Sequence, residues 1–256
     1  MNKVHNFSAG PAILPQEAIE AGKEALTNFA NTGLSILEVS HRSKQYVAVM
    51  DEARDLVKRL WNLNDDYEVM YLHGGASTQF LMVAYNLLKT KACYIDTGVW
   101  SSKSIKEAGL FGEVDVIASS KDKNYTYIPK DYTIPTDADY LHITSNNTIY
   151  GSQMHKFPET ALPLVCDMSS DIFSRKIDAN QFDIMYAGAQ KNLGPAGATL
   201  VVVKKDVLGK VSRQIPSMMD YKIHISKGSM FNTPPAFPVY VVLQTLKWID
   251  KTGIET

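Results

Sequence analysis

The stretch FDIMYAGAQKNLGPAGATLVVV, residues 182–203, indicates both a fold and a kind of chemistry. Its two ends, residues 182–187 and 198–203, are short apolar runs that predict β-strands. Between them, one lysine, Lys191, lies in a turn of glycine and other small residues, where a backbone or a ligand can approach closely. A lysine on a solvated surface needs no such surroundings. We therefore expect Lys191 to react with a ligand where the two strands meet.

Apolar strands alternate with amphipathic helices along the rest of the chain. We predict further strands, which end in polar or glycine-containing turns, at residues 67–75, 91–98, 113–120, 139–147 and 162–170. We predict helices, from apolar spacing and starting residues, at residues 15–29, 43–61, 76–88, 100–112 and 234–253. Residues 121–140 are polar and predict a loop or a short hairpin. The alternation predicts an α/β fold, a mostly parallel sheet with helices on both faces.

The composition is that of one large globular domain. The chain has 256 residues, 45% hydrophobic and 21% charged, and its net charge of −1 gives no indication of a nucleic-acid partner. Cys93 and Cys166 lie in predicted strands without the spacing of a zinc site. We therefore expect reduced thiols, a cytoplasmic protein and no metal. The sequence shows neither a signal peptide nor an apolar run long enough to cross a bilayer, so we expect no membrane partner.

Polar residues follow several predicted strands, at the edge where parallel sheets bind ligands. The motif HGGAST, residues 73–78, suits a phosphate group because its glycines precede a helix N-terminus, although an ordinary turn has the same pattern. Asp167 follows an apolar run, where a carboxylate is costly unless it is paired. It either caps the next turn or faces a cationic ligand atom. Trp100, at the start of a predicted helix, either packs in the core or stacks on a ligand.

Three loop motifs are also open to two interpretations. Arg42, beside His41, is either solvated or bound to an anionic substrate through two parallel hydrogen bonds. Thr148 follows a predicted strand, where it either shapes a turn or contacts a ligand. Asn232 and Thr233 precede two prolines, and they either belong to a rigid loop or contact a ligand.

A lysine in a tight turn, a strand-end carboxylate, an anion-binding turn and an aromatic ring are together what pyridoxal 5'-phosphate requires. The lysine forms a Schiff base with this cofactor. The carboxylate keeps the pyridine nitrogen protonated, so that the ring can accept electrons from the substrate. The turn holds the phosphate, and the aromatic side chain stacks on the ring. The combination predicts a pyridoxal phosphate enzyme.

Several motifs resemble those of the phosphoserine aminotransferase family, which belongs to the class V aminotransferase group of fold-type I pyridoxal phosphate (PLP) enzymes. The motifs are NFSAGPA (6–12), EVSHRS (38–43), HGGAS (73–77), YAGAQKNLGPAG (186–197) and GSMFNTPP (228–235). The likeness extends along nearly the whole chain, and the lysine motif and GSMFNTPP are the most specific to the family. The resemblance implies the large domain of PLP fold type I.

The resemblance also implies roles for single residues. Lys191 would form the Schiff base and Asp167 would pair with the pyridine nitrogen, and these two would be the catalytic residues. The other implied cofactor-binding residues are Ala76, Ser77 and Gln190 at the phosphate, Trp100 on the ring, Thr148 near the phenolic oxygen, and Asn232 and Thr233 at the phosphate of the neighbouring subunit's cofactor. His41 and Arg42 would bind the phosphate of the substrate. Because the subunits would share their active sites, the active unit would be a homodimer.

The implied reaction transfers an amino group between L-glutamate and 3-phosphohydroxypyruvate, and it gives 2-oxoglutarate and O-phospho-L-serine for serine biosynthesis. Lys191 would move the proton of the substrate's α-carbon as general base and acid. Some members of the family also act on a four-carbon phosphate on the route to vitamin B6.

Family members are longer than this chain, so we expect a fragment that lacks most of the small C-terminal domain. The fragment would be a clipped chain, a truncated one, or one piece of a split protein with a separate C-terminal polypeptide. Residues 1–15 would join the small domain, and residues 16–256 would form the large PLP-binding domain.

Three other functions stay open at this point. A module that binds the cofactor without turnover is one of them, because the missing part would carry the arginine for the substrate's α-carboxylate. A cysteine desulfurase, which has the same fold type, would need a reactive cysteine on a mobile loop, whereas both cysteines lie in predicted strands. A Rossmann dehydrogenase would need the G-x-G-x-x-G pattern, which HGGAST does not provide.

Overall fold

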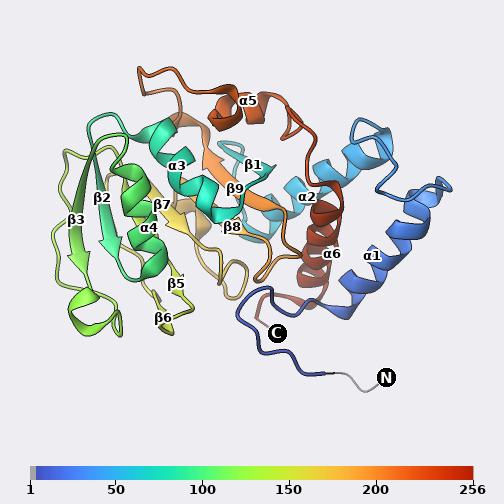
Figure 1. The fold of residues 1–256 in the computed structure, drawn as a ribbon, viewed down its shortest axis with the longest axis horizontal. Coiled ribbons are helices and arrows are strands. Elements are labelled where there is room, and N and C mark those ends of the chain that lie inside the picture. The colour runs from blue at the N-terminus through green and yellow to red at the C-terminus, as the bar shows by residue number, and fades with distance from the viewer. Residues whose placement is uncertain (1–3, 256) are drawn as a thin grey trace.

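A seven-stranded sheet forms the centre of the structure, a computed structural model that describes residues 4–255. The strands lie in the order β1-β9-β8-β7-β4-β2-β3 (Figure 1). Their bounds are Tyr67–Leu72 (β1), Lys91–Asp96 (β2), Glu113–Ser119 (β3), Leu141–Thr144 (β4), Leu164–Asp167 (β7), Ile184–Gly188 (β8) and Thr199–Lys204 (β9). A separate small hairpin pairs β5, Asn146–Asn147, with β6, Ser152–Gln153.

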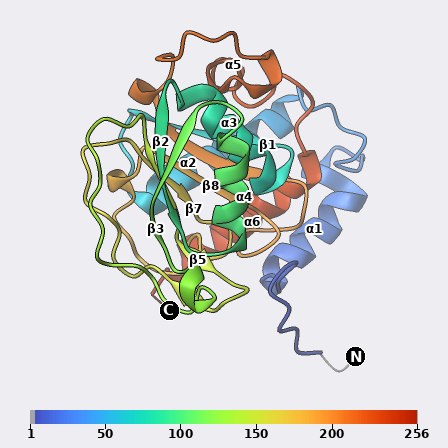
Figure 2. The same cartoon turned by 60° about the vertical axis from the view of Figure 1, so that its left-hand side comes forward.

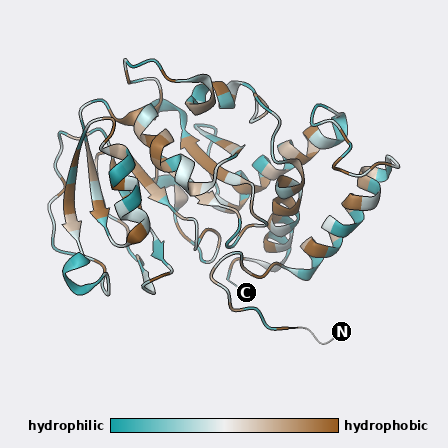
Figure 3. Cartoon of the chain, viewed as in Figure 1, coloured by the Kyte–Doolittle hydropathy of each residue, from teal (hydrophilic) through white to brown (hydrophobic). Residues whose placement is uncertain are grey.

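Helices cover both faces of the sheet (Figures 1 and 2). Their bounds are Gln16–Asn28 (α1), Lys44–Trp61 (α2), Gly75–Leu87 (α3), Val99–Ala108 (α4), Tyr221–Ser226 (α5) and Ala236–Thr252 (α6). One apolar cluster joins α3, α4 and α5 to one face, and another joins α1, α2 and α6 to the opposite face. Successive residues of β9 alternate between the two clusters, as a strand buried on both faces requires. The strands are accordingly apolar over most of their length (Figure 3).

The prediction of a mostly parallel sheet is confirmed, with β9 as the exception. The pairs β2–β3, β2–β4, β4–β7 and β7–β8 are parallel, whereas β9 runs antiparallel to both β8 and β1. The reason is the short connection from β8 to β9, residues 189–198. A parallel return needs a crossover of about a dozen residues or more, which usually contains a helix. The turn that carries Lys191 therefore leads directly into an antiparallel strand.

Two short elements differ from the prediction, whereas the loop predicted at residues 121–140 is confirmed. The segment 139–147 is not one strand, because β4 ends at Thr144 and β5 begins at Asn146 in the separate hairpin. Residues 121–140 form a loop that contains one short 3-10 turn, Lys121–Lys123. Helix α5 has no counterpart in the prediction; the Asp220 side chain begins it by accepting a hydrogen bond from the Lys222 N–H at 2.8 Å.

The N-terminal segment lies across the turn that carries Lys191. The backbone N–H of Ala12 donates to the carbonyl oxygen of Gln190 at 2.9 Å. Gly10 lies against the Lys191 side chain, since a Cβ added at Gly10 would be only 2.6 Å from Lys191 Cε. The first residues of the described chain thus help to form the surroundings of this lysine. Among residues 4–255, no helix is both long and apolar enough to cross a membrane.

Candidate active site

A cavity of about 240 Å³ opens where strands β1, β4, β7 and β8 end. It is lined by Gly74, Gly75, Ala76, Ser77, Phe80, Trp100, Thr144, Asn146, Thr148, Asp167, Ser169, Ser170, Gln190 and Lys191. Parallel α/β sheets bind their ligands at this edge. The structure therefore brings together seven of the eleven residues that the sequence indicated: Ala76, Ser77, Trp100, Thr148, Asp167, Gln190 and Lys191.

Lys191 is half-buried in the turn between β8 and β9. The glycines of this turn do more than leave room for a ligand, which was their expected role. A Cβ at Gly194 would be 2.8 Å from Val242 Cγ2, so this glycine allows the turn to pack against α6. Gly197 has a φ of +118°, a value that L side chains rarely adopt. The lysine is thus held by a turn that is itself fixed by packing.

Asp167 ends β7 and is only 4% exposed. Its Oδ1 accepts a hydrogen bond from the Ser169 N–H at 2.9 Å. Burial raises the pKa of Asp167 to about 6, and the nearby carboxylate of Asp171 adds to the rise, whereas Ser169 and the cationic Lys191 lower it. A buried carboxylate of this kind is most stable when it is protonated or faces a cation. Asp167 is therefore suited to a protonated ring nitrogen.

The start of α3 lines the cavity and has the features of an anion-binding site. Gly74 and Gly75 have φ values of +90° and +67°, which fold the chain sharply between β1 and α3. A Cβ at Gly74 would overlap with Thr78 Oγ1, which donates to the Gly74 carbonyl at 3.0 Å. The first N–H groups of a helix lack intrahelical acceptors, and they carry the positive end of the helix dipole. This part of the cavity is suited to a phosphate group.

Trp100 and Thr148 lie on two elements that pack tightly together. Trp100 is in the first turn of α4, and Thr148 is in the turn of the β5–β6 hairpin. A Cβ at Gly98 would be 2.5 Å from Asn147 Oδ1, and Asn147 Nδ2 donates to Thr97 Oγ1 at 3.0 Å. Since these contacts join the start of α4 to the hairpin, they hold in place the two elements that bring Trp100 and Thr148 to the cavity.

The structure adds cavity residues that the sequence did not single out. They are Phe80, Thr144, Asn146, Ser169 and Ser170. The two glycines of the α3 turn also line the cavity, and the sequence had indicated them in the HGGAST motif. Phe80 comes four residues after Ala76 and therefore lies on the same face of α3, which helical spacing could have indicated. Thr144 is paired with Asp167 across β4 and β7. Its hydroxyl is buried and has no hydrogen-bond partner among the described residues, so it is available to a ligand.

Four of the predicted residues lie outside the cavity. Asn232 is half-buried and Thr233 is exposed, and the Thr233 carbonyl oxygen is 2.8 Å from Nε2 of His73, the residue before the α3 turn. Arg42 is exposed before α2. His41 precedes it, and its Nε2 is buried without a partner among the described residues. The cavity therefore does not include these four side chains.

The fold and the cavity are those of an aminotransferase, and the chain belongs to the class V aminotransferase family, whose model matches residues 4–256. It is similar to phosphoserine aminotransferases. The one from Parabacteroides distasonis is 62% identical over 251 residues, which are 98% of this chain and 71% of the relative. Among solved structures, phosphoserine aminotransferase from Bacillus circulans subsp. alkalophilus has a TM-score of 0.96 at 45% identity, over 100% of this chain and 72% of that one.

A further solved relative has PLP bound. The PLP-bound phosphoserine aminotransferase from Trichomonas vaginalis is 34% identical to this chain, with a TM-score of 0.91, over 98% of this chain and 72% of that one. The cavity residues of this chain fit such a cofactor on their own chemistry. A helix N-terminus is available for the phosphate, a buried carboxylate for the ring nitrogen, and a lysine for the aldehyde carbon. Residues 4–255 contain no cluster of metal-ligating side chains.

Proposed function

We propose that this chain is a PLP-dependent transaminase that interconverts 3-phosphohydroxypyruvate and L-glutamate with O-phospho-L-serine and 2-oxoglutarate. The observation that carries the proposal is the convergence of Lys191, Asp167 and the start of α3 in one cavity. The relatives at 55–62% identity that are named phosphoserine aminotransferase support the substrate class, and with it a role in serine biosynthesis. Their shared name favours an enzyme over a module that binds cofactor without turnover.

The cofactor would be held by residues from five segments of the chain. The backbone N–H groups of Ala76 and Ser77, with the Gln190 side chain, would bind the phosphate. Asp167 would accept a hydrogen bond from the protonated ring nitrogen, and Trp100 would stack on the ring. Thr148 would hydrogen-bond to the ring's phenolic oxygen. When bound, the cofactor supplies a covalent link to the amino group and withdraws electrons from the α-carbon of the substrate.

The chain's own residues would provide proton transfer and exclude water. Lys191 Nζ would accept the proton from the substrate's α-carbon and later return it, as general base and acid. The buried Asp167 would remain anionic beside a cation, since its removal from water makes an unpaired charge costly. Phe80 and Trp100 would keep water away from the reacting carbon, because both line the cavity with apolar surface.

The four residues outside the cavity support the proposal of a homodimer with shared active sites. Asn232 and Thr233 would reach the phosphate of the neighbouring subunit's cofactor, from a loop attached to the rim through His73. Arg42 and His41 would bind the phosphate of the substrate. We further propose that residues 16–256 form the large PLP-binding domain and that residues 1–15 belong to the small one. Action on the vitamin B6 intermediate and a cytoplasmic location stay predictions.

A spectroscopic titration tests the function. Pyridoxal phosphate added to the protein should give a visible absorbance band, which L-glutamate should bleach and 3-phosphohydroxypyruvate should restore. Pyruvate, which lacks the phosphate, is the matched control and should restore the band far less. A band that glutamate leaves unchanged would show a binding module without turnover. Equal restoration by pyruvate would remove the assignment of a phosphorylated substrate.

A further inference from the structure

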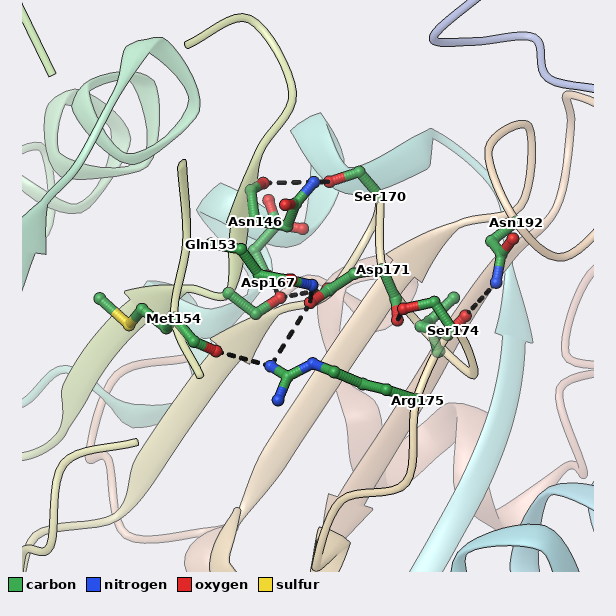
Figure 4. A network of polar contacts seen from close by, with 11 residues as sticks. Asn146, Gln153, Met154, Asp167, Ser170, Asp171, Ser174, Arg175 and Asn192 are labelled. Atoms are coloured by element: carbon green, nitrogen blue, oxygen red, sulfur yellow. Dashed lines mark hydrogen bonds and ion pairs between the residues drawn. The ribbon is translucent and has the colours of Figure 1, made fainter. Parts of the chain in front are cut away.

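A second buried carboxylate, Asp171, lies close to Asp167 but does not line the cavity. Figure 4 shows both side chains within one network of polar contacts. Only 9% of Asp171 is exposed. A carboxylate removed from water is costly unless several hydrogen bonds and a cation compensate for the lost hydration. The partners of Asp171 therefore indicate its role.

Three side chains from separate segments converge on the Asp171 carboxylate. The Ser145 hydroxyl donates to Oδ1, and Gln153 Nε2 donates to Oδ2 at 3.0 Å. Arg175 Nη2 lies 3.8 Å from Oδ2. Ser145 follows β4, Gln153 belongs to β6, and Arg175 follows β7 along with Asp171 itself. One carboxylate thus connects the ends of two central strands with the small hairpin.

The β5–β6 hairpin depends on such contacts for its position. Each of its strands has only two residues, and an isolated hairpin of this size is not stable in water. Its turn carries Thr148, which lines the cavity. Two further hydrogen bonds also attach the hairpin. Asn146 Nδ2 donates to Ser170 Oγ at 2.8 Å, and Ser170 Oγ donates to the Asn146 carbonyl oxygen at 3.0 Å. These bonds and the Asp171 contact all lead to the turn that follows Asp167.

On its other side, the Asp171 network reaches the backbone of Asp167. The Ser145 N–H and the Ser145 hydroxyl both lie 3.0 Å from the Asp167 carbonyl oxygen. The hydroxyl has a single proton, so it is shared between this carbonyl and the Asp171 carboxylate. Arg175 Nη2 also donates to the Met154 carbonyl oxygen at 2.6 Å, just after the hairpin. The Asp171 network therefore joins the end of β7, where Asp167 lies, to the hairpin whose turn lines the cavity.

We propose that Asp171 is a positioning residue of the cofactor site. Its carboxylate fastens the hairpin that carries Thr148 to the turn that follows Asp167, and Arg175 compensates its charge from outside the cavity. This inference depends on the proposed function in one respect, namely that pyridoxal phosphate binds in this cavity. A supporting effect is electrostatic: the negative charge of Asp171 contributes to the raised pKa of Asp167, which strengthens the attraction of Asp167 for a cation.

The test compares Asp171→Asn with Asp183→Asn. Asp183 is a half-buried carboxylate before β8 that accepts a hydrogen bond from the Leu164 N–H at 2.8 Å, at the opposite end of the strands. Both variants lose one charge and an acceptor. Absorbance titration with pyridoxal phosphate should show about tenfold weaker binding by Asp171→Asn, which corresponds to ~1.4 kcal/mol. Asp183→Asn should bind pyridoxal phosphate with the same affinity as the unsubstituted protein, even if its melting temperature is lower.

Hydrogen exchange on the cofactor-free protein provides a second readout. Amides of residues 146–154 should exchange faster in Asp171→Asn and at an unchanged rate in Asp183→Asn. Unchanged exchange in Asp171→Asn, or equal loss of cofactor affinity in both variants, would overturn the proposal. If the unsubstituted protein binds no pyridoxal phosphate, the proposed function fails, and the exchange experiment still decides the role of Asp171.

Gln153→Met decides the question if Asp171→Asn does not fold. This change keeps the size of the side chain and removes its donor to Asp171, without altering either central strand. We expect faster exchange of the hairpin amides and about threefold weaker cofactor binding, roughly half the free-energy change of the tenfold effect. Cofactor affinity and exchange equal to those of the unsubstituted protein would overturn the proposal.

Discussion

Gly10 and Lys191 touch, although nearly the whole cofactor-binding fold separates them in sequence. A Cβ at Gly10 would lie 2.6 Å from Lys191 Cε and 3.3 Å from Nζ. Real Cβ atoms do not approach another atom as closely as the first of these distances, so one of the two groups would have to move. The end of a lysine side chain moves more easily than a backbone held by the Ala12–Gln190 hydrogen bond.

Gly10→Ala should therefore displace the lysine while the fold persists. We expect the visible band to appear about tenfold more slowly after mixing with pyridoxal phosphate, which is a barrier increase of ~1.4 kcal/mol. The melting temperature should stay close to that of the unsubstituted protein. Gly109→Ala is the matched control, because its added Cβ would make only ordinary contacts, at 3.5 Å or more. Equal rates for the two variants would exclude a role for Gly10 in placing Lys191.

Lys191→Ala should abolish both the visible band and transamination. The lysine supplies the only amine on the described cavity wall, and the turn around it is held by the packing of Gly194 against α6 rather than by the side chain itself. Circular dichroism and the melting temperature should therefore be preserved. Lys176→Ala, at an exposed position, is the control and should keep full activity. A visible band that persists in Lys191→Ala would show that the central assignment is wrong.

Asp167→Asn should make the cofactor-free protein more stable above pH 6. The unfolded chain releases the Asp167 proton near pH 3.8 and the folded chain near pH 6, so raising the pH across this window favours unfolding. At pH 8 this titration lowers the free energy of unfolding by about 2–3 kcal/mol. The neutral amide of Asp167→Asn does not titrate and so avoids this loss. Urea denaturation of both proteins at pH 4 and pH 8 measures it.

The expected pattern for Asp167 is a stability difference that is small at pH 4 and large at pH 8. Comparing the two proteins at each pH cancels the titration of all other groups. A difference that is independent of pH would contradict the raised pKa. The same variant should bind pyridoxal phosphate weakly, because an amide cannot pair with a protonated ring nitrogen as a carboxylate does.

Arg42→Ala should weaken the phosphorylated substrate selectively. If Arg42 binds the substrate's phosphate through two charge-assisted hydrogen bonds, its loss should raise the KM for 3-phosphohydroxypyruvate by about tenfold or more. The KM for L-glutamate should change little. Lys44→Ala, another exposed cation two residues away, is the control. Equal losses for both substrates of Arg42→Ala would remove the phosphate role.

Much of the large-scale fold could be predicted because it depends on local patterns. Apolar runs buried on both faces indicated the strands of the sheet, and helical spacing indicated α1, α2, α3, α4 and α6. Helix α5 and the β5–β6 hairpin escaped prediction because such short elements are stabilised by contacts with distant segments rather than by their own sequence. The Asp171 carboxylate, which binds Ser145 and Gln153, is one such contact.

The sequence by itself determined the chemistry of the site: a lysine in a turn of small residues, a strand-end carboxylate and a glycine turn before a helix. Each of these signals lies within a few consecutive residues, so the chain order preserves it. Only the tertiary structure decided which side chains share the cavity and which support it from outside. Phe80 and Thr144 line the cavity, Gly10 touches Lys191, and Asp171 lies close to Asp167. The physical reason is that such contacts join residues distant in sequence, and their energy depends on distance and burial in the folded chain.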